Sequence, residues 1–213
     1  MIVFEDVLAK TGNFTLNVGS LKLEAPGVMA VTGQNGAGKT VFLKTIIGFT
    51  KLEKGKIYVN NIPNNKRGWQ EDTGVYFDDF QLIPYLTPEE YFYFIIKIKK
   101  LTKETSLKLV SRLSEKLNLS EEKKYIRELS KGTQKKVGLI SSLLTNPSLV
   151  IWDEPFSNLD EASVEGLNNI VKEYFRPHEQ KLLLYATNTE VGHYTERLKI
   201  EEEKLAGSFV KRI

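Results

Sequence analysis

The residues best suited to chemistry in this sequence are Gly33, Gln34, Asn35, Gly36, Ala37, Gly38, Lys39 and Thr40. They follow the P-loop spacing of Gly, four residues and Gly-Lys-Thr, in which successive backbone N–H groups can surround a polyphosphate. In such a loop Lys39 reaches the β- and γ-phosphates, and the hydroxyl of Thr40 takes a position on Mg²⁺. The stretch therefore predicts a site for a nucleoside triphosphate.

A pair of acidic residues supplies the next candidate chemistry. Asp153 and Glu154 directly follow residues 149–152, an apolar run that suits a strand buried on both faces. Carboxylates at the end of such a strand lie where open α/β sheets bind ligands. Asp153 is the expected carboxylate near Mg²⁺, and Glu154 is placed to polarise water as a general base. The alternative is an acidic loop without a chemical role.

The sequence on both sides of the P-loop pattern predicts the elements that must position it. Residues 28–32 form an apolar run of strand length. Residues 41–47 have apolar residues at helical spacing and precede Gly48, a residue type that commonly ends helices. Strand, glycine-rich loop and helix is the order that the pattern requires. The alternative, a turn that contains Lys-Thr by chance, does not require these elements.

The remaining sequence predicts a mixed α/β fold. The other predicted strands are residues 2–4, 14–18 and 21–24, which form an antiparallel flap, then 55–62, 74–77, 182–186 and, at an edge of the sheet, 198–201. The predicted helices are residues 88–100, 103–118, one that follows Ser130, and 161–175. Phe14 in the flap either stacks on a nucleotide base or packs in the core.

Four patterns along the chain resemble those of the nucleotide-binding subunit of an ATP-binding cassette (ABC) transporter. They are the Walker A loop at residues 33–40, the segment Leu-Ser-Lys-Gly-Thr-Gln at residues 129–134, which is similar to the family's signature LSGGQ, the Walker B strand at residues 149–153 followed by Glu154, and Ser-Asn-Leu-Asp at residues 157–160, which resembles its D-loop. The resemblance covers roughly residues 2–205.

This resemblance implies a P-loop NTPase core of the ABC-ATPase type, with an antiparallel β flap and a helical subdomain. We expect one domain over residues 1–213, in which approximately residues 1–77 and 146–213 form the nucleotide-binding core and approximately residues 78–145 form the helical subdomain. The expected cofactors are ATP and Mg²⁺. The short chain with Leu-Ser-Lys-Gly at residues 129–132 favours an export-type system.

Ser130 and Gly132 are implied to contact ATP across a dimer. Ser130 opens a predicted helix, whose unpaired N–H groups favour an anion, and Gly132 permits close backbone approach. In the family this anion belongs to the ATP held by the other subunit. The resemblance therefore implies a second ABC ATPase subunit, in a homodimer or a heterodimer, and integral membrane subunits as partners. The expected location is cytoplasmic and peripheral, at the inner face of the cell membrane.

Two positions depart from the family pattern. The glutamine that the family places near Mg²⁺ falls on Asp78, or on the adjacent Asp79; an aspartate can ligate the metal but adds a negative charge. The switch histidine falls on Asn188, which can donate a hydrogen bond to the γ-phosphate but cannot carry a proton or a positive charge. We therefore expect hydrolysis to be slower by about 10²-fold. His193 is expected to lie on the surface of a helix.

Composition limits the other possibilities. The chain has 213 residues, 41% of them apolar, which is enough for one compact unit. It contains no cysteine, so disulfides and thiolate metal sites are excluded. The apolar run at residues 91–96 is far shorter than the roughly 20 residues of a membrane span, and residues 1–5 do not begin a secretion signal. A net charge of +3 does not indicate a nucleic-acid partner.

Two other functions fit parts of the sequence. A soluble ABC-type ATPase of DNA or ribosome processes typically has a coiled-coil insertion, zinc-binding cysteines or a second cassette, and none is present here. A P-loop kinase of a small molecule would leave residues 129–134 without a role. In a transporter, the aromatic helix around residues 91–94 either receives a cytoplasmic helix of the membrane partner or packs within the helical subdomain.

Overall fold

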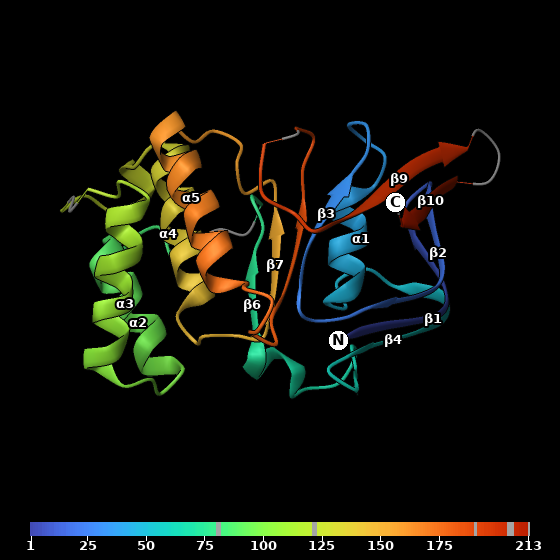
Figure 1. The fold of residues 1–213 in the computed structure, drawn as a ribbon, viewed down its shortest axis with the longest axis horizontal. Coiled ribbons are helices and arrows are strands. Elements are labelled where there is room, and N and C mark those ends of the chain that lie inside the picture. Colours follow the sequence, from blue (N-terminus) through green and yellow to red (C-terminus); the bar gives the residue numbers. More distant parts are fainter. Residues whose placement is uncertain (80–81, 121–122, 190, 204–206, 213) are drawn as a thin grey trace.

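The structure is a computed structural model that describes residues 1–79, 82–120, 123–189, 191–203 and 207–212. Within these ranges, ten strands form one mixed sheet in the order β5-β4-β1-β2-β10-β9-β3-β8-β7-β6. Part of the sheet is antiparallel and part is parallel, and helices cover it on both sides (Figure 1). The α/β fold predicted from the sequence is confirmed.

The antiparallel part contains the first strands of the chain. β1 (Ile2–Thr11) forms a hairpin with β2 (Phe14–Leu23) and pairs on its other side with β4 (Leu52–Val59), which also pairs with the short β5 (Ile62–Pro63). The predicted flap is confirmed. Residues 14–18 and 21–24 are one strand rather than two, because a bulge in the pairing with β1 accommodates the residues between them.

The parallel part positions the candidate chemistry. β3 (Gly27–Thr32), β8 (Leu182–Ala186), β7 (Leu149–Asp153) and β6 (Thr73–Tyr76) run parallel to one another, and every residue of β7 and β8 is buried. Strands of this kind are apolar throughout because both of their faces are covered. The carboxyl ends of these strands lie side by side at the same end of the sheet. The P-loop and the acidic pair begin there.

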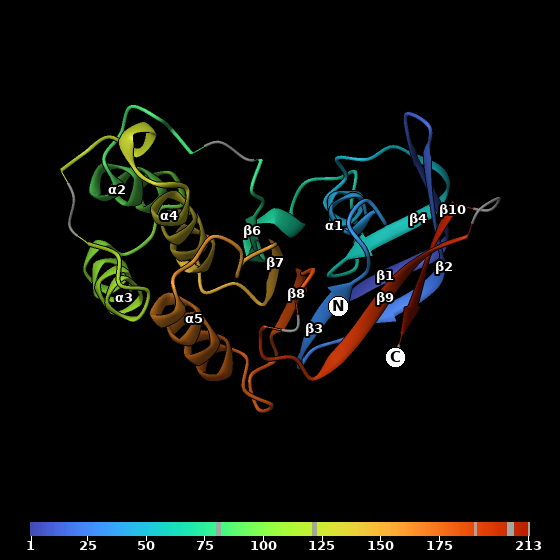
Figure 2. The same cartoon turned by 90° about the horizontal axis from the view of Figure 1, so that it is seen from above.

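Alternate residues of these strands divide the core between two faces. Val31 of β3 packs in the cluster that contains α1 (Lys39–Ile46), whereas Val150 of β7 packs in the cluster that contains α4 (Lys131–Leu143) and α5 (Glu161–Tyr174). Figure 2 shows α1 on one side of the parallel strands and α4 and α5 on the other. Residues of α1 and of α4 are thus separated by the sheet.

Two further helices lie beyond α4 and α5, at the end of the molecule farthest from β1 (Figure 1). They are α2 (Pro88–Ile98) and α3 (Lys103–Lys116). At the start of α2, the Thr87 side chain accepts a hydrogen bond from the Glu90 N–H at 3.3 Å, and the Glu90 carboxylate accepts one from the Thr87 N–H at 2.8 Å. None of the helices in the described ranges has the length and apolar content that a bilayer span requires.

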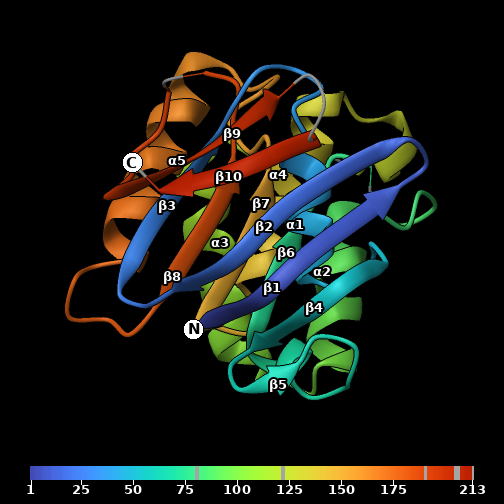
Figure 3. The ribbon, with the colours of Figure 1, turned by 90° about the vertical axis from the view of Figure 1, so that its right-hand side faces the viewer.

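The strand predicted at an edge of the sheet is not at an edge. Residues 198–201 belong to β9 (Glu196–Glu203), which pairs with β3 on one side and with β10 (Gly207–Arg212) on the other. Leu198 and Ile200 are therefore buried. β10 pairs with β2, so the hairpin β9–β10 joins the two parts of the sheet (Figure 3). No strand was predicted for the charged residues at the end of the sequence, where the structure has β10.

Candidate active site

The P-loop connects the end of β3 to the start of α1. Gly38 precedes the helix with φ of 103°, a conformation that glycine adopts without strain. The ring of Phe14 packs against it, since a Cβ at Gly38 would lie 2.3 Å from the ring. Phe14 also packs against the core cluster on the α1 side of the sheet. The structure therefore places Phe14 beside the loop, and its stacking on a base stays a prediction.

Lys39, the first residue of α1, folds back over the loop. Its side chain is only 7% exposed, and Nζ donates hydrogen bonds to the backbone oxygens of Gly33 at 3.0 Å and Gln34 at 3.4 Å. The same nitrogen lies 3.9 Å from Oε1 of Glu154. The ammonium group is thus held between the P-loop and a carboxylate, in a position to pair with a phosphate.

Thr40 and Asp153 form a second link between the P-loop and β7. The Thr40 hydroxyl donates a hydrogen bond to Oδ2 of Asp153 at 2.8 Å, while the buried Oδ1 of Asp153 has no hydrogen-bond partner in the described part of the chain. Burial raises the pKa of Asp153, the Thr40 hydrogen bond opposes this rise, and the nearby Asp78 adds to it. An unpaired carboxylate oxygen next to a hydroxyl fits the oxygen ligands that Mg²⁺ prefers.

Glu154 turns from the end of β7 towards the P-loop. Its φ of 47° lies in the left-handed region, which costs on the order of 1–3 kcal/mol for a residue other than glycine. Its N–H donates to the Ala186 oxygen at 3.0 Å, which ties it to the end of β8. Burial raises the pKa of its carboxyl group, and the Lys39 ammonium opposes this rise. Such a carboxylate beside a phosphate-binding loop suits a general base.

Asn188 lies between Glu154 and the P-loop. Its backbone N–H donates to Oε2 of Glu154 at 3.4 Å, and its side-chain Nδ2 donates to Oδ1 of Asn35 at 3.4 Å. These three residues follow three neighbouring parallel strands, β8, β7 and β3. The fold therefore brings together the P-loop, the acidic pair and the residue at the predicted switch position.

Comparison with known proteins identifies the family to which this arrangement belongs. A family model described as ABC transporter matches residues 16–157, which is more than half of the chain. The chain belongs to this family. The matched residues of this ABC protein include the P-loop, the signature segment at residues 129–134 and the pair Asp153 and Glu154.

Several relatives of this ABC protein are ATP-binding proteins of transporters. The uncharacterized ABC transporter ATP-binding protein YhaQ of Bacillus subtilis is 32% identical over 180 residues, which make up 80% of this chain and 58% of YhaQ. The Fe(3+) ions import ATP-binding protein FbpC of Fusobacterium nucleatum is 31% identical over 156 residues, 72% of this chain and 42% of FbpC. The taurine import ATP-binding protein TauB of Shigella flexneri is 28% identical over 172 residues, 80% of this chain and 67% of TauB. The chain thus spans only part of these relatives.

Solved structures share the fold of this ABC protein. The dimeric structure of the ATP-binding cassette MJ0796 in a post-hydrolysis state bound to ADP and Pi has a TM-score of 0.79 at 22% identity, and the match covers 93% of this chain and 94% of that one. A structure of the ATP binding subunit of an ABC transporter has a TM-score of 0.82 at 21% identity, over 93% of this chain and 85% of that one.

Asp78, which is predicted to take the place of the ABC family's glutamine, contacts two side chains. Its Oδ1 accepts a hydrogen bond from the Tyr76 hydroxyl at 2.8 Å and forms an ion pair with Lys135 at 3.0 Å. The adjacent Asp79 forms an ion pair with Lys44 of α1 instead. Asp78 is close enough to Asp153 to raise its pKa. Ligation of Mg²⁺ by Asp78 stays a prediction.

The signature residues of this ABC protein lie at the start of α4. The Ser130 hydroxyl accepts a hydrogen bond from the Thr133 N–H at 3.1 Å and so caps the helix. Gly132 packs against the D-loop, because a Cβ there would lie 2.5 Å from the backbone oxygen of Asn158. α1 and α4 cover opposite faces of the sheet (Figure 2). In the described part of the chain, the Ser130 hydroxyl contacts Thr133 and is not hydrogen-bonded to the P-loop of the same chain.

Three residues that hold the site together were not predicted. Tyr76, Lys135 and Ser157 contact Asp78 or Glu154, directly or through one another. One sequence feature points to Lys135: an aspartate at the predicted glutamine position calls for a nearby positive charge. Which of the chain's lysines supplies this charge depends on how α4 packs against β6 and β7, so the sequence alone does not identify it.

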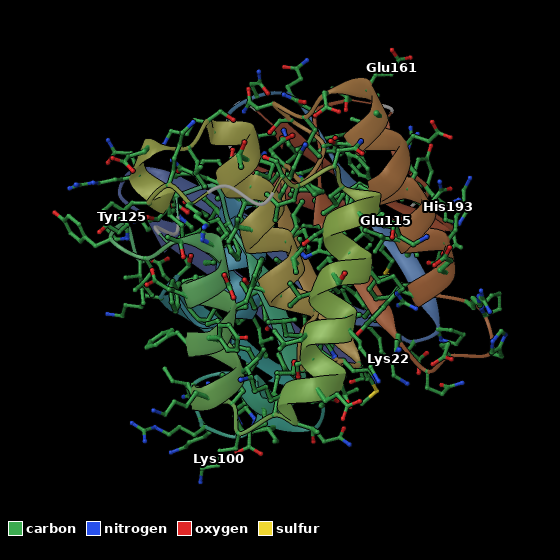
Figure 4. The ribbon with its side chains drawn as sticks, turned by 90° about the vertical axis from the view of Figure 1, so that its left-hand side faces the viewer. Lys22, Lys100, Glu115, Tyr125, Glu161 and His193 are labelled. Carbon is green, nitrogen blue, oxygen red and sulfur yellow. The ribbon has the colours of Figure 1, made fainter. Side chains whose placement is uncertain are left out.

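His193 is not in a helix, contrary to the prediction. It lies in the irregular segment before β9, where its N–H donates to Oδ1 of Asn168 in α5 at 2.9 Å. Figure 4 shows His193 beside α5. Gly192, directly before His193, has a φ of 134°, which lies outside the range of a right-handed helix.

Proposed function

We propose that this chain is the ATP-binding and ATP-hydrolysing subunit of an ABC transporter. The observation that supports this function most directly is the hydrogen bond between Thr40 and Asp153, with Lys39 and Glu154 facing each other 3.9 Å apart beside it. This arrangement joins a phosphate-binding loop to a metal-binding carboxylate and a general base. Phosphoryl transfer to water needs these three groups in one place.

Each of these residues has a distinct task in hydrolysis. The N–H groups of the P-loop and the Lys39 ammonium bind the phosphates and stabilise the negative charge that develops on them. Thr40 and Asp153 would hold Mg²⁺, which would neutralise part of the negative charge of the phosphates. Glu154 orients the attacking water and accepts its proton. Asn188 donates a hydrogen bond to the γ-phosphate from its side-chain amide.

This subunit binds ATP normally and hydrolyses it slowly. Asn188 occupies the switch position, where it contacts Glu154 and Asn35 but cannot supply the proton or the positive charge of a histidine. Normal binding is supported by Lys39, which folds over the P-loop, and by Thr40, which is hydrogen-bonded to Asp153. Slow turnover is compatible with a heterodimer in which the other subunit carries a faster site, and equally with activation by the membrane subunits.

ATP brings two such subunits together. Ser130 and Gly132 of one subunit close over the nucleotide in the P-loop of the other, because the start of α4 presents N–H groups to an anion. Within one chain these residues and the P-loop belong to opposite faces of the sheet, so each subunit supplies half of two sites. The second subunit is either another copy of this chain or a related ABC ATPase.

The membrane partner docks beside α2 and α4, at the inner face of the cell membrane. Tyr85 is 65% exposed and Tyr125 is 44% exposed, and the Arg127 guanidinium lies over both rings, 4.7 Å and 5.6 Å from their centroids. Figure 4 shows Tyr125 pointing away from the ribbon. Arg127 also lines a cavity of about 530 Å³, together with residues that include Leu82 and Pro84. A short amphipathic helix of a membrane subunit suits this surface.

Of the aromatic residues of α2, only some remain available to this partner. Phe92 is buried in the core, whereas Phe94 is 39% exposed. One face of the helix therefore packs within the protein and another is free to dock.

The direction of transport does not follow from the family. Relatives named for the import of Fe(3+) ions and of taurine show that membership of this family does not by itself imply export.

The ATPase function is tested by phosphate release from the purified protein. Glu154→Gln should lower kcat by about 10²–10⁴-fold, because a general base is removed, and should leave ATP affinity near the wild-type value. Glu115→Gln is the matched control, since Glu115 is exposed on α3 (Figure 4), which lies at the opposite end of the molecule from α1 and the P-loop (Figure 1). Equal phosphate release by the wild type and Glu154→Gln would refute the proposal.

A further inference from the structure

Lys135, in the second turn of α4, is almost completely buried, with 2% of its side chain exposed. A buried ammonium group needs acceptors for its three N–H groups. Its Nζ donates to the backbone oxygen of Glu154 at 2.6 Å and to the Ser157 hydroxyl, and it forms an ion pair with Oδ1 of Asp78 at 3.0 Å. All three donors are used, and they reach two different segments of the site.

The first of these segments is the turn that carries Glu154. The backbone oxygen of Glu154 accepts hydrogen bonds from the Ser157 hydroxyl at 3.0 Å and from the Ser157 N–H at 3.3 Å, in addition to the one from Lys135. These hydrogen bonds stabilise the backbone of Glu154, whose φ of 47° is unfavourable for glutamate. The backbone is thus fixed from the α4 side, while the carboxylate points the other way, towards Lys39.

The second segment is the one that follows β6. The Tyr76 hydroxyl donates to the same Asp78 oxygen at 2.8 Å, and Lys135 Nζ lies 6.0 Å from the centre of the Tyr76 ring. Gly138, one turn further along α4, lets this ring approach the helix, because a Cβ there would lie 2.4 Å from it. Asp78 is therefore held against α4 with its charge offset by Lys135.

We propose that Lys135 is a positioning residue for ATP hydrolysis. It holds the backbone of Glu154 in its left-handed turn and anchors Asp78 against α4, so that the general base is aimed at the γ-phosphate and no unpaired negative charge stands near the nucleotide. The role of Glu154 in this statement rests on the proposed function.

The neighbouring Lys136 provides a matched control. Its side chain is also buried, and its Nζ contacts Oδ2 of Asp160 at 3.0 Å and the backbone oxygen of Asn118 at 3.4 Å. Lys136 therefore loses an ion pair and buried packing when it is replaced, as Lys135 does, but its contacts do not include Glu154 or Asp78. A difference in catalysis between the two replacements reports on positioning rather than on stability.

The first experiment compares steady-state kinetics of Lys135→Met and Lys136→Met in the full chain. Lys135→Met should lower kcat by about 10²-fold, the loss typical of a misplaced catalytic group, and change the KM for ATP little. Lys136→Met should lower Tm but keep kcat near the wild-type value. The proposal is overturned if Lys135→Met keeps wild-type kcat, or if both variants lose kcat equally.

The double variant Asp78→Asn/Lys135→Met separates positioning from charge balance. It removes both charges of the pair, so the exposed Asp78 no longer carries a negative charge that Lys135 would offset. The value of kcat should stay low, because the Glu154 backbone still lacks its ammonium donor. Recovery of kcat in the double variant would contradict the positioning role.

Hydrogen exchange gives a readout that does not depend on turnover. The peptide with residues 154–157 should exchange its amide hydrogens faster in the double variant than in the wild type, and no faster in Lys136→Met. If these amide hydrogens exchange no faster in the double variant than in the wild type, Lys135 does not stabilise this turn. If the wild type releases no more phosphate than Glu154→Gln, the proposed function fails, whereas the exchange result still decides whether Lys135 fixes the turn.

Discussion

Asn188 donates its backbone N–H to the Glu154 carboxylate and its side-chain amide to Asn35, so it links the predicted general base to the P-loop. Replacing it by histidine adds a group that can carry a proton and a positive charge. Asn188→His should therefore raise kcat by about 10- to 100-fold, with little change in the affinity for ATP. Steady-state phosphate release at saturating ATP checks this prediction.

The control for this gain is Thr189→His. Thr189 is exposed next to Asn188 and contacts Thr187 rather than Glu154. A histidine there adds the same chemical group without the contact to the general base, so kcat should stay at the wild-type value. An equal gain in both variants, or a fast wild type with no gain in Asn188→His, would show that residue 188 does not limit hydrolysis.

Residue types and spacing were sufficient to assign Lys39, Thr40, Asp153 and Glu154 to one candidate site, and the fold brings these residues together. Each belongs to a local pattern that includes the strand or helix positioning it. Lys135 has no such pattern. Its importance depends on burial among three segments that lie far apart in the sequence, and a lysine in a helix more often faces solvent. Charged residues whose partners come from other elements are therefore the part of the site that sequence patterns do not predict.

At the scale of elements, the start of α2 has a capping box that α3 lacks. The Thr87 side chain accepts a hydrogen bond from the Glu90 N–H, whereas Thr102, at the same position of α3, has no such bond from its side chain. Thr87→Ala should reduce the free energy of unfolding by about 1 kcal/mol and lower Tm by about 2–4 °C. Thr102→Ala should change Tm by much less.

Thermal unfolding followed by circular dichroism checks this pair of variants. Both replace a threonine before a helix by alanine, so differences in helix propensity cancel between them. If Thr102→Ala costs as much as Thr87→Ala, the stabilisation does not come from the capping hydrogen bond.

The strands of this protein were predicted with mixed success for a physical reason. Residues 149–152 and 182–186 are continuously apolar, which is typical of strands with both faces covered, and they form β7 and β8. Residues 198–201 alternate between apolar and charged, which indicates one buried face. Alternating polarity shows which face of a strand is buried, but it does not show whether another strand pairs with the backbone on each side. It therefore did not predict that β10 lies beside β9.

At the scale of the whole molecule, the separation of the P-loop from Ser130 leads to a test of assembly. With ATP bound and hydrolysis blocked by Glu154→Gln, light scattering should give twice the mass of one 24.3 kDa chain if the proposed dimer is a homodimer. Adding Ser130→Glu should restore the single-chain mass, because its negative charge opposes the γ-phosphate of the other subunit's ATP.

A second replacement on α3 controls for the added charge. Ser111 is exposed on this helix and does not belong to the signature segment, so Ser111→Glu should leave the ATP-dependent mass unchanged. A single-chain mass for Glu154→Gln at saturating ATP would exclude a homodimer and favour assembly with a different ABC ATPase.

The hairpin β9–β10 has a consequence for how the protein is made. It comes last along the described chain but lies between β2 and β3 in the sheet. On the ribosome, β2 is therefore complete long before its neighbour β10 has been translated, and its open edge can pair with other chains until then. A message cut short before residue 207 would yield a nascent chain with that edge permanently open. The topology thus makes incomplete translation products prone to aggregation.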